Sequence, residues 1–344
     1  MSWFTEHLNN IAVSFLSVIF EGVPFLLLGA LISGVVDVFV STERMQKLMP
    51  KNGAAAICIS GLLGLIFPMC ECGSVIVIRR FIKKGLPLSA AVTYMLAAPI
   101  VSPIVALSTF AAFKGQNPPG AVHLGATGFM KWYFDHEGSI TMTTLRLSLG
   151  YLIAIAIGFV VHRLPAAAIL NPALLTTPLP RGRAGLSISA APPPGEPAAP
   201  DFTAIVAAAS TPKKFLLAVQ SATSDFLEVA FFFVIGTAVA SVFNTTVNQT
   251  VIQPLATNAP LAIVSLMGLA VILSVCSTTD AFIAASLSFP FAAKLGFLLF
   301  GPVFDLKLMW LYGLLFKRRF VALLGLTLFV LIALISWRIA GMAL

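Results

Sequence analysis

Two thiols and a carboxylate occupy consecutive positions in the stretch FPMCECGS, as Cys70, Glu71 and Cys72. A second cysteine motif, SVCSTTD, holds Cys276 and Asp280. Thiolates are soft ligands that prefer thiophilic metals and metalloids, and a nearby carboxylate can carry a proton. The spacing is not the CxxC of thioredoxin-like redox proteins, and three thiols without a histidine in the apolar segments do not complete a closed zinc site. We therefore expect the three cysteines to contact a soft metal or metalloid cargo, and we expect no resident metal and no cofactor.

The rest of the chain is strongly apolar. Of its 344 residues, 58% are hydrophobic and 10% are charged, with a mean hydropathy of +0.98, whereas soluble domains carry about 25% charged residues. This composition predicts an all-α polytopic membrane protein in a lipid bilayer. The net charge of +8 comes from residues between the apolar segments and forms no basic face, so we expect no nucleic-acid partner. No GxxxxGK[ST] motif occurs, and we predict a transporter rather than an enzyme.

Six apolar stretches are long enough to cross a bilayer, which requires about 20 residues. They cover residues 11–36, 86–113, 144–163, 221–243, 294–316 and 320–342. Two further apolar stretches, 53–78 and 260–283, contain the cysteine motifs and are interrupted by polar residues. These two stretches either cross as simple helices, which would make eight crossings with the other six, or dip into the membrane and return.

The two halves of the sequence resemble each other. Three matches occur in the same order at nearly one offset, of 207, 206 and 203 residues. The matching pairs are Glu21 with Glu228, Cys70 with Cys276, and Pro99 with Pro302. Such an internal duplication is common in secondary transporters, and it favours a transporter built from two repeats.

The distribution of Lys and Arg separates the two membrane schemes. Eight simple crossings that begin in the cytoplasm put 11 basic residues inside and nine outside. With two re-entrant hairpins, each half crosses three times, the N-terminus is outside, and 15 basic residues fall inside against five outside. The five are Lys114, Lys131, Arg146, Lys294 and Arg338. Because basic residues favour the cytoplasmic side, we predict two inverted repeats, each with about three full crossings and one re-entrant or broken helical hairpin.

Residues 164–213 separate the two halves and are rich in Pro, Ala, Gly and Ser. Such a composition cannot bury a core, so we predict a flexible cytoplasmic linker there. The first transmembrane repeat then covers residues 1–163 and the second covers residues 214–344.

The inverted scheme brings the cysteine motifs together. Non-helical backbone at membrane depth is tolerated only where protein buries it or water reaches it. The two hairpins approach from opposite sides of the membrane, so their turns are expected to meet near the midplane. Cys70, Cys72 and Cys276 would then surround one central site.

Four further polar or helix-breaking residues lie close to these motifs. Pro99 and Pro302 interrupt their apolar segments and would supply broken helix ends beside the site. Asp305 and Lys307 either join the site or neutralise each other as a structural pair. Cys58 lies in the stretch AAAICISG and is interpreted as a packing residue.

Three long stretches carry a family resemblance. FPMCECGSVIVIRRFIKKGLPLSAAVTYMLAAPIVSP, CSTTDAFIAAS and LLFGPVFDLKLMWLYGLLFKRRF resemble the predicted permease family that includes the bacterial organoarsenical efflux permeases. The resemblance implies a permease of the bacterial inner membrane, with efflux of trivalent organoarsenicals as the expected activity. Motif by motif, it implies as site residues Cys70, Glu71, Cys72, Pro99, Cys276, Asp280, Pro302, Asp305 and Lys307.

The chain departs from the family pattern at one point. An acidic residue is expected soon after the second-half cysteine, and here Ser277, Thr278 and Thr279 precede Asp280. This departure weakens any proton-coupling role for that segment.

Two other functions are compatible with the same residues. One is a permease for a sulfur compound or a soft metal ion, and the other is a membrane thiol–disulfide carrier. The absence of CxxC counts against the carrier. Besides the substrate and the bilayer, a homo-oligomer or a small soluble redox or metallochaperone protein would be a suitable partner.

Overall fold

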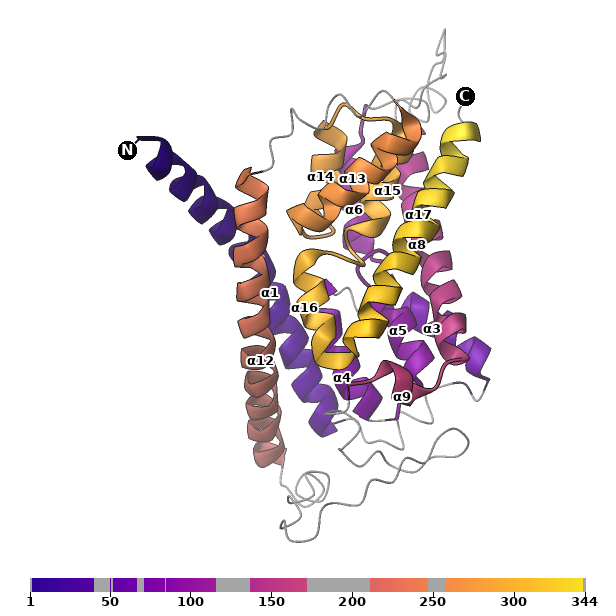
Figure 1. Cartoon of the computed structure of the whole chain (residues 1–344). Coiled ribbons are helices and arrows are strands. Elements are labelled where there is room, and N and C mark those ends of the chain that lie inside the picture. Colours follow the sequence, from indigo (N-terminus) through magenta and orange to yellow (C-terminus); the bar gives the residue numbers. More distant parts are fainter. Residues whose placement is uncertain are drawn as a thin grey trace, which may run out of the picture.

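A computed structural model of the chain describes residues 2–39, 50, 52–66, 71–83, 85–115, 137–171, 211–246 and 258–342. These residues are helical apart from turns and one isolated β-bridge (Figure 1). Cys70 lies outside the described residues.

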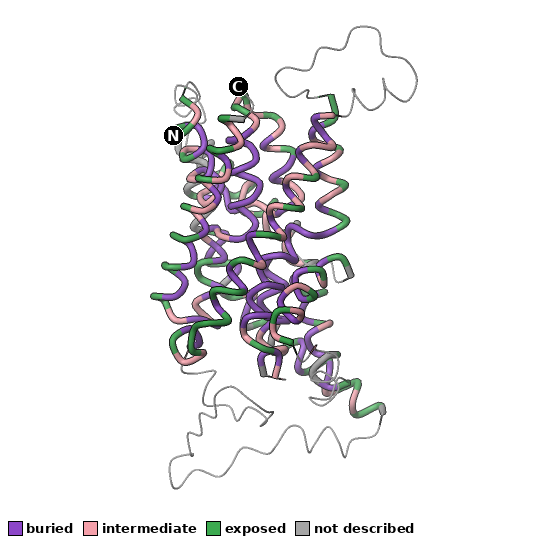
Figure 2. The backbone as a smooth tube through the Cα atoms, turned by 90° about the vertical axis from the view of Figure 1, so that its right-hand side faces the viewer, coloured by how far each residue is buried: buried purple, intermediate pink, exposed green. Residues whose placement is uncertain are grey.

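Four long helices are α1 (Ser2–Phe39), α8 (Glu137–His162), α12 (Thr211–Thr246) and α17 (Arg318–Met342). Each contains 24 to 27 consecutive residues apolar enough to cross a membrane. Exposed residues lie mainly on the outer sides of the molecule and buried residues inside (Figure 2). Large apolar side chains such as Phe20 and Phe231, which are 75% and 64% exposed, lie on the outer faces of α1 and α12. A helix satisfies its own backbone polar groups, so such faces suit lipid.

Shorter helices fill the space between the long ones in consecutive pairs. The pairs are α3 (Gly53–Ile66) with α4 (Glu71–Lys83), α5 (Leu88–Ala97) with α6 (Pro103–Ala112), α13 (Ala259–Leu273) with α14 (Thr279–Ser286), and α15 (Phe291–Phe300) with α16 (Leu306–Leu315). Prolines explain two of the breaks, because proline has no backbone N–H and disfavours helix in the residue before it. Pro99 lies in the turn between α5 and α6, and Pro302 lies in the turn between α15 and α16.

The two halves have the same order of helices, and corresponding helices run in opposite directions. In each half a long helix is followed by a hairpin, a broken pair and a second long helix. In Figure 1 the hairpin α3–α4 opens at the lower end of the molecule and the hairpin α13–α14 opens at the upper end. The predicted class, an all-α polytopic membrane protein, is confirmed, with four of the described helices long and apolar enough to span a membrane. The opposite directions of the two halves agree with the predicted inverted repeats, while the re-entrant course of the hairpins and the three crossings per repeat stay predictions.

Contacts between the halves cross over at the centre. Helix α6 packs against α14, and α4 packs against α16. Helices α1 and α12 form an extensive antiparallel pair beside them (Figure 1). A Cβ at Gly29 of α1 would lie 2.9 Å from the Cα of Gly73, and a Cβ at Gly236 of α12 would lie 2.9 Å from the Cα of Lys307. These glycines allow the α1–α12 pair to approach the inner helices closely.

The start of the predicted linker is part of the folded structure. Helix α9 (Ala166–Ile169) follows α8, and Asn171 N–H then donates to the carbonyl of Leu315 at 2.9 Å. Lys317 N–H donates in turn to the carbonyl of Ile169 at 2.9 Å. Residues 164–171 are therefore bound to the turn between α16 and α17, and residues 211–213 form the first turn of α12. The remainder of the predicted linker, 172–210, lies outside the described residues.

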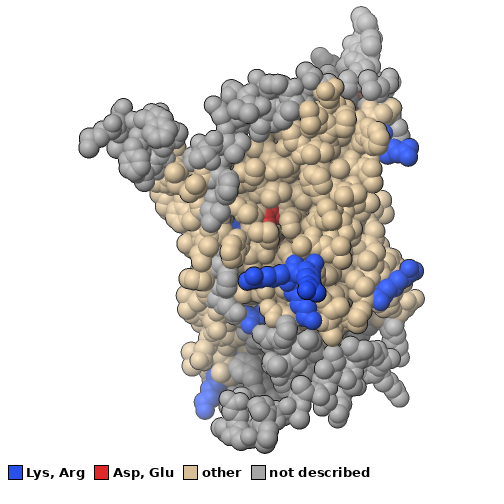
Figure 3. Space-filling view, in the orientation of Figure 1, with Lys and Arg blue, Asp and Glu red and all other residues tan. Residues whose placement is uncertain are grey.

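Basic side chains concentrate toward one end of the molecule. On the face shown in Figure 3, Lys and Arg gather mainly in the lower half. That end contains the first turns of α12 and α17, with Lys213 and Lys214 in one and Arg318 and Arg319 in the other. The clustering fits the predicted placement of this end on the cytoplasmic side.

Candidate functional site

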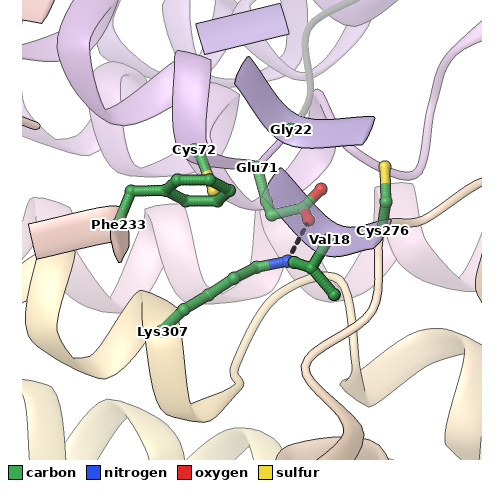
Figure 4. A pocket seen from close by; sticks show the side chains of 7 residues that line it. All are labelled: Val18, Gly22, Glu71, Cys72, Phe233, Cys276 and Lys307. Atoms are coloured by element: carbon green, nitrogen blue, oxygen red, sulfur yellow. Dashed lines mark hydrogen bonds and ion pairs between the residues drawn. The ribbon is translucent and has the colours of Figure 1, made fainter. Parts of the chain in front are cut away.

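The start of α4 and the segment between α13 and α14 border one pocket (Figure 4). Its lining comes from both halves and consists of Val18, Gly22, Glu71, Cys72, Phe233, Cys276 and Lys307. The volume open to the centre of a water molecule in this pocket is about 10 Å³, which is enough for roughly one water. The pocket is therefore nearly closed in this conformation.

The first hairpin supplies Glu71 and Cys72 from the first turn of α4. A carboxylate is favoured at a helix N-terminus, where the unpaired N–H groups and the helix dipole are positive. The hydroxyl of Ser74 donates to the carbonyl of Glu71 at 2.8 Å, inside the protein. Glu71 and Cys72 are each only 2% exposed. The helix start thus fixes a carboxylate and a thiol at the pocket wall.

The second hairpin turns at Ser274, which has a left-handed backbone with φ 47° and ψ 42°. This conformation ends α13, as αL residues commonly do at helix C-termini. The Ser274 hydroxyl donates to the carbonyl of Val271 at 3.1 Å and accepts from Leu306 N–H at 3.1 Å. Two residues further on, Cys276 reaches the pocket. The sequence analysis did not identify Ser274, since a serine in a polar interruption carries no signal of a left-handed conformation.

Lys307 joins the hairpin tips electrostatically. Its Nζ donates to Glu71 Oε1 at 2.9 Å and to the carbonyl of Ser274 at 3.0 Å. Asp305 Oδ2 lies 3.4 Å from the same Nζ, and Asp305 Oδ1 accepts from Leu308 N–H at 2.7 Å as the N-cap of α16. The three charged side chains are at most 3% exposed. Lys307 therefore has two carboxylate partners, of which Asp305 also caps the helix that carries it.

A second buried ion pair links the halves through Arg146 and Asp280. Arg146 Nη2 donates to the two Asp280 oxygens at 2.9 and 2.7 Å and to the carbonyl of Ser277 at 2.9 Å. Arg146 Nη1 donates to Thr109 Oγ1 at 2.8 Å. The arginine is fully buried.

The partner of Asp280 was not anticipated from the sequence, which placed Arg146 among the external basic residues. An arginine within the apolar stretch TTLRLSLGYLIA is the signal that could have identified it. Its burial against a carboxylate makes it part of the protein interior.

The thiols belong to opposite halves. Cys72 is buried and Cys276 is half-buried, and neither forms a disulfide. The hydroxyl of Thr278 lies 3.6 Å from Cys276 Sγ. Cys58 also forms no disulfide, and it does not line the pocket. Two cysteines from opposite halves thus line one pocket, together with the charged side chains of Glu71 and Lys307.

The proposed site residues fall into three places. Glu71, Cys72, Cys276 and Lys307 line the pocket, and Asp305 lies directly behind Lys307. Asp280 lies in the pair with Arg146, and Pro99 and Pro302 lie in the buried turns of the broken helices. Cys70 lies outside the described residues. Among the described residues, no three His, Cys, Asp or Glu side chains are grouped so that they could hold a metal ion.

Comparisons with known proteins agree with the architecture. A family model described as a predicted permease matches residues 7–124 and 132–340. The UPF0718 protein YcgR of Bacillus subtilis is 31% identical over 320 residues, which cover 92% of this chain and 91% of that protein. A Streptococcus mutans protein named as a two-component membrane permease complex subunit is 30% identical over 309 residues, which cover 89% of this chain and 87% of its own. No solved structure matches the chain.

Proposed function

The chain belongs to the family of predicted permeases, and we propose that it exports small thiophilic solutes, trivalent organoarsenicals in particular, across the bacterial inner membrane. One observation carries the proposal: Cys72 and Cys276, from opposite halves, line the same central pocket. The cargo would bind between them, with Cys70, two positions before Cys72 in the sequence, as a third thiol.

The chemistry of trivalent arsenic suits two thiols. A hydrated organoarsenical, R–As(OH)₂, exchanges each hydroxyl for a cysteine sulfur and releases one water per exchange. The product of two exchanges is R–As(S–Cys)₂ with two waters released, and no oxidant or reductant is needed. Exchange with another thiol or with water reverses each step, so the cargo can leave. Arsenic(III) is a soft centre, which sulfur binds in preference to oxygen.

The remaining pocket walls suit the organic group. Val18 and Phe233 are apolar, and Phe233 offers an aromatic ring to an arsenical that carries one. The pocket as it stands has room for about one water, so binding requires the α1–α12 pair to separate from the hairpin tips. Inverted repeats commonly alternate access by moving one bundle against another. The pocket is lined by the α1–α12 pair on one side and by the inner helices on the other, which suits such a movement.

A partner protein forms part of the proposal. The Streptococcus mutans relative is named as a subunit of a two-component permease complex. By analogy, this chain would act with a second subunit or a soluble thiol protein that delivers cargo to the cytoplasmic end. Affinity purification from the native membrane, with and without arsenical exposure, tests for one.

Uptake into everted membrane vesicles tests the cargo. Phenylarsine oxide, copper(I) and thiosulfate are compared side by side in vesicles with and without the protein. We expect saturable uptake of the arsenical, and a loss of more than about tenfold, or 1.4 kcal/mol, in Cys72→Ser and in Cys276→Ser. Cys58→Ser is the matched control, since Cys58 does not line the pocket, and it should behave like the wild type.

The alternatives make different predictions in the same vesicles. Uptake of copper(I) or thiosulfate without uptake of the arsenical would favour a soft-metal or sulfur permease. Cysteine-dependent electron transfer without any uptake would favour a thiol–disulfide carrier.

A further inference from the structure

One acceptor in the pocket has no hydrogen-bond partner among the residues that the structure describes. Glu71 Oε1 accepts from Lys307, but Glu71 Oε2 is buried and makes no hydrogen bond with the described residues. In Figure 4 one carboxylate oxygen faces Lys307 and the other points away from it. A buried charged oxygen without a donor is costly, and its place in the pocket lining indicates that something else donates to it.

We propose that Glu71 is the residue that determines which thiophilic solutes the pocket accepts: uncharged solutes with a hydroxyl donor are admitted, and anions are excluded. The inference rests on the proposed function and specifies its substrate class. After one thiol exchange, R–As(OH)₂ becomes R–As(OH)(S–Cys) with release of one water. The remaining hydroxyl then donates to Glu71 Oε2.

The charges around the pocket support exclusion of anions. Glu71 and Asp305 are negative and Lys307 is positive, so the cluster carries a net charge of −1 when all three are ionised. The other lining side chains add no positive charge, since they are Val18, Gly22, Cys72, Phe233 and Cys276. Asp280, the next carboxylate, is already compensated by Arg146. Two like charges about 7 Å apart at an effective dielectric constant of about 20 repel enough to lower occupancy more than about tenfold.

The other carboxylates are not available for this role. Both oxygens of Asp280 accept from Arg146, and the residue does not line the pocket. Asp305 Oδ1 caps α16, and its Oδ2 faces Lys307 at 3.4 Å. Glu71 therefore combines a place in the lining with an oxygen that no described residue occupies.

Two arsenicals of the same size separate charge from shape. 4-Carbamoylphenylarsine oxide is neutral, and 4-carboxyphenylarsine oxide carries a negatively charged carboxylate in place of the carboxamide. Initial uptake of each into proteoliposomes with the full-length protein is measured as accumulated arsenic. The wild type should take up the neutral probe more than about tenfold faster, and thiosulfate should not compete.

Substitutions then assign the selectivity to a residue. Glu71→Gln keeps the shape but removes the negative charge and places an amide in the pocket, so the ratio of the two rates should fall to within about threefold. Glu71→Asp keeps the charge and should keep the ratio high. Asp305→Asn changes the cluster charge by the same amount, but its carboxylate lies outside the lining, behind Lys307. The ratio should therefore fall clearly less than in Glu71→Gln.

Each outcome has a distinct meaning. Equal uptake of both probes by the wild type, or an unchanged ratio in Glu71→Gln, overturns the role of Glu71 and leaves the arsenical permease standing. If the ratio of the two uptake rates falls equally in Glu71→Gln and in Asp305→Asn, the selectivity comes from the charge of the whole cluster. That result also overturns the role of Glu71. Absence of cysteine-dependent uptake of either probe by the wild type refutes the proposed function itself.

Discussion

Lys307 Nζ lies 2.9 Å from Glu71 Oε1, although the two residues are 236 positions apart in the sequence. The bond joins the first turn of α16 in one half to the first turn of α4 in the other. Both side chains are 3% exposed, so each loses its hydration and depends on the other for compensation. The contact between the repeats at the pocket is therefore an ion pair and not only apolar packing.

Removal of the shared cation should destabilise the protein strongly. Lys307→Met leaves Glu71 and Asp305 buried without a positive partner, at a cost of about 3–5 kcal/mol. Glu71→Gln should be milder, because Lys307 keeps Asp305 and the Ser274 carbonyl. Thermal unfolding in detergent measures both. If Lys307→Met unfolds at the same temperature as the wild type, the ion pair is not needed for folding.

The pair of Arg146 with Asp280 should behave as a fixed structural link. Arg146→Met strands a buried carboxylate, which costs about 3–5 kcal/mol, and it should reduce the yield of folded protein. Arg146→Lys should recover only part of the loss, because an ammonium cannot reproduce the planar contacts with Asp280, Ser277 and Thr109.

Arg338→Met provides the comparison for this arginine. Arg338 lies on the exposed side of α17, and its removal should change stability by less than about 0.5 kcal/mol. An equal effect of Arg146→Met and Arg338→Met would contradict a structural role for the buried pair.

Larger side chains at Gly29 of α1 and Gly236 of α12 should destabilise the protein. A Cβ at Gly29 or at Gly236 would come within 2.9 Å of a backbone Cα atom, so Gly29→Ala and Gly236→Ala should each cost about 1–3 kcal/mol through overpacking. Gly268 of α13 is the comparison, because a Cβ there would have no other atom within 4 Å. Gly268→Ala should therefore be neutral or stabilise by up to about 1 kcal/mol. Unfolding temperatures of the three variants in one detergent decide whether close approach matters.

Much of the fold followed from the sequence because the signals are local or repeated. Four of the six apolar stretches of spanning length correspond to the long helices. The other two, 86–113 and 294–316, are each divided into two short helices at the predicted breaks near Pro99 and Pro302. The same offset of 207 that relates Glu21 to Glu228 also relates Gly29 to Gly236, which have equivalent packing roles. The length of the apolar stretches and the internal duplication therefore predicted the main features of the architecture.

The details of the site could not be read in the same way, because they depend on distant contacts. The sequence left open whether Asp305 and Lys307 join the site or neutralise each other. They lie 3.4 Å apart, but the closer partner of Lys307 is Glu71 in the other half. Arg146 was assigned to the external surface by counting charges, and it lies buried against Asp280. Which cation meets which carboxylate depends on how the repeats dock, and no local pattern encodes that.

The left-handed turn at Ser274 gives a further prediction. A β-branched side chain is strained in this conformation, so Ser274→Val should lose about 1–2 kcal/mol from the backbone alone, together with the acceptor for Leu306 N–H. Ser274→Asn should be tolerated better, because asparagine adopts φ > 0 more readily. Unfolding temperature and phenylarsine oxide uptake are measured for both. Greater damage from Asn than from Val would show that the backbone conformation is not the determinant.

Orientation in the membrane is open to direct measurement. Of the five basic residues counted outside, Arg146 and Lys294 are buried in the protein, which leaves three to face the external side against 15 inside. The described residues that flank the linker, 171 and 211, lie at the same end of the molecule as the basic start of α17 (Figure 1). From the positive-inside rule we predict that this end is cytoplasmic. In a variant without the native cysteines, Ser2→Cys and Thr127→Cys should react with an impermeant maleimide in intact cells, whereas Ser187→Cys should react only after permeabilisation. If Ser187→Cys reacts in intact cells, the predicted orientation is wrong, and each hairpin enters the membrane from the opposite side.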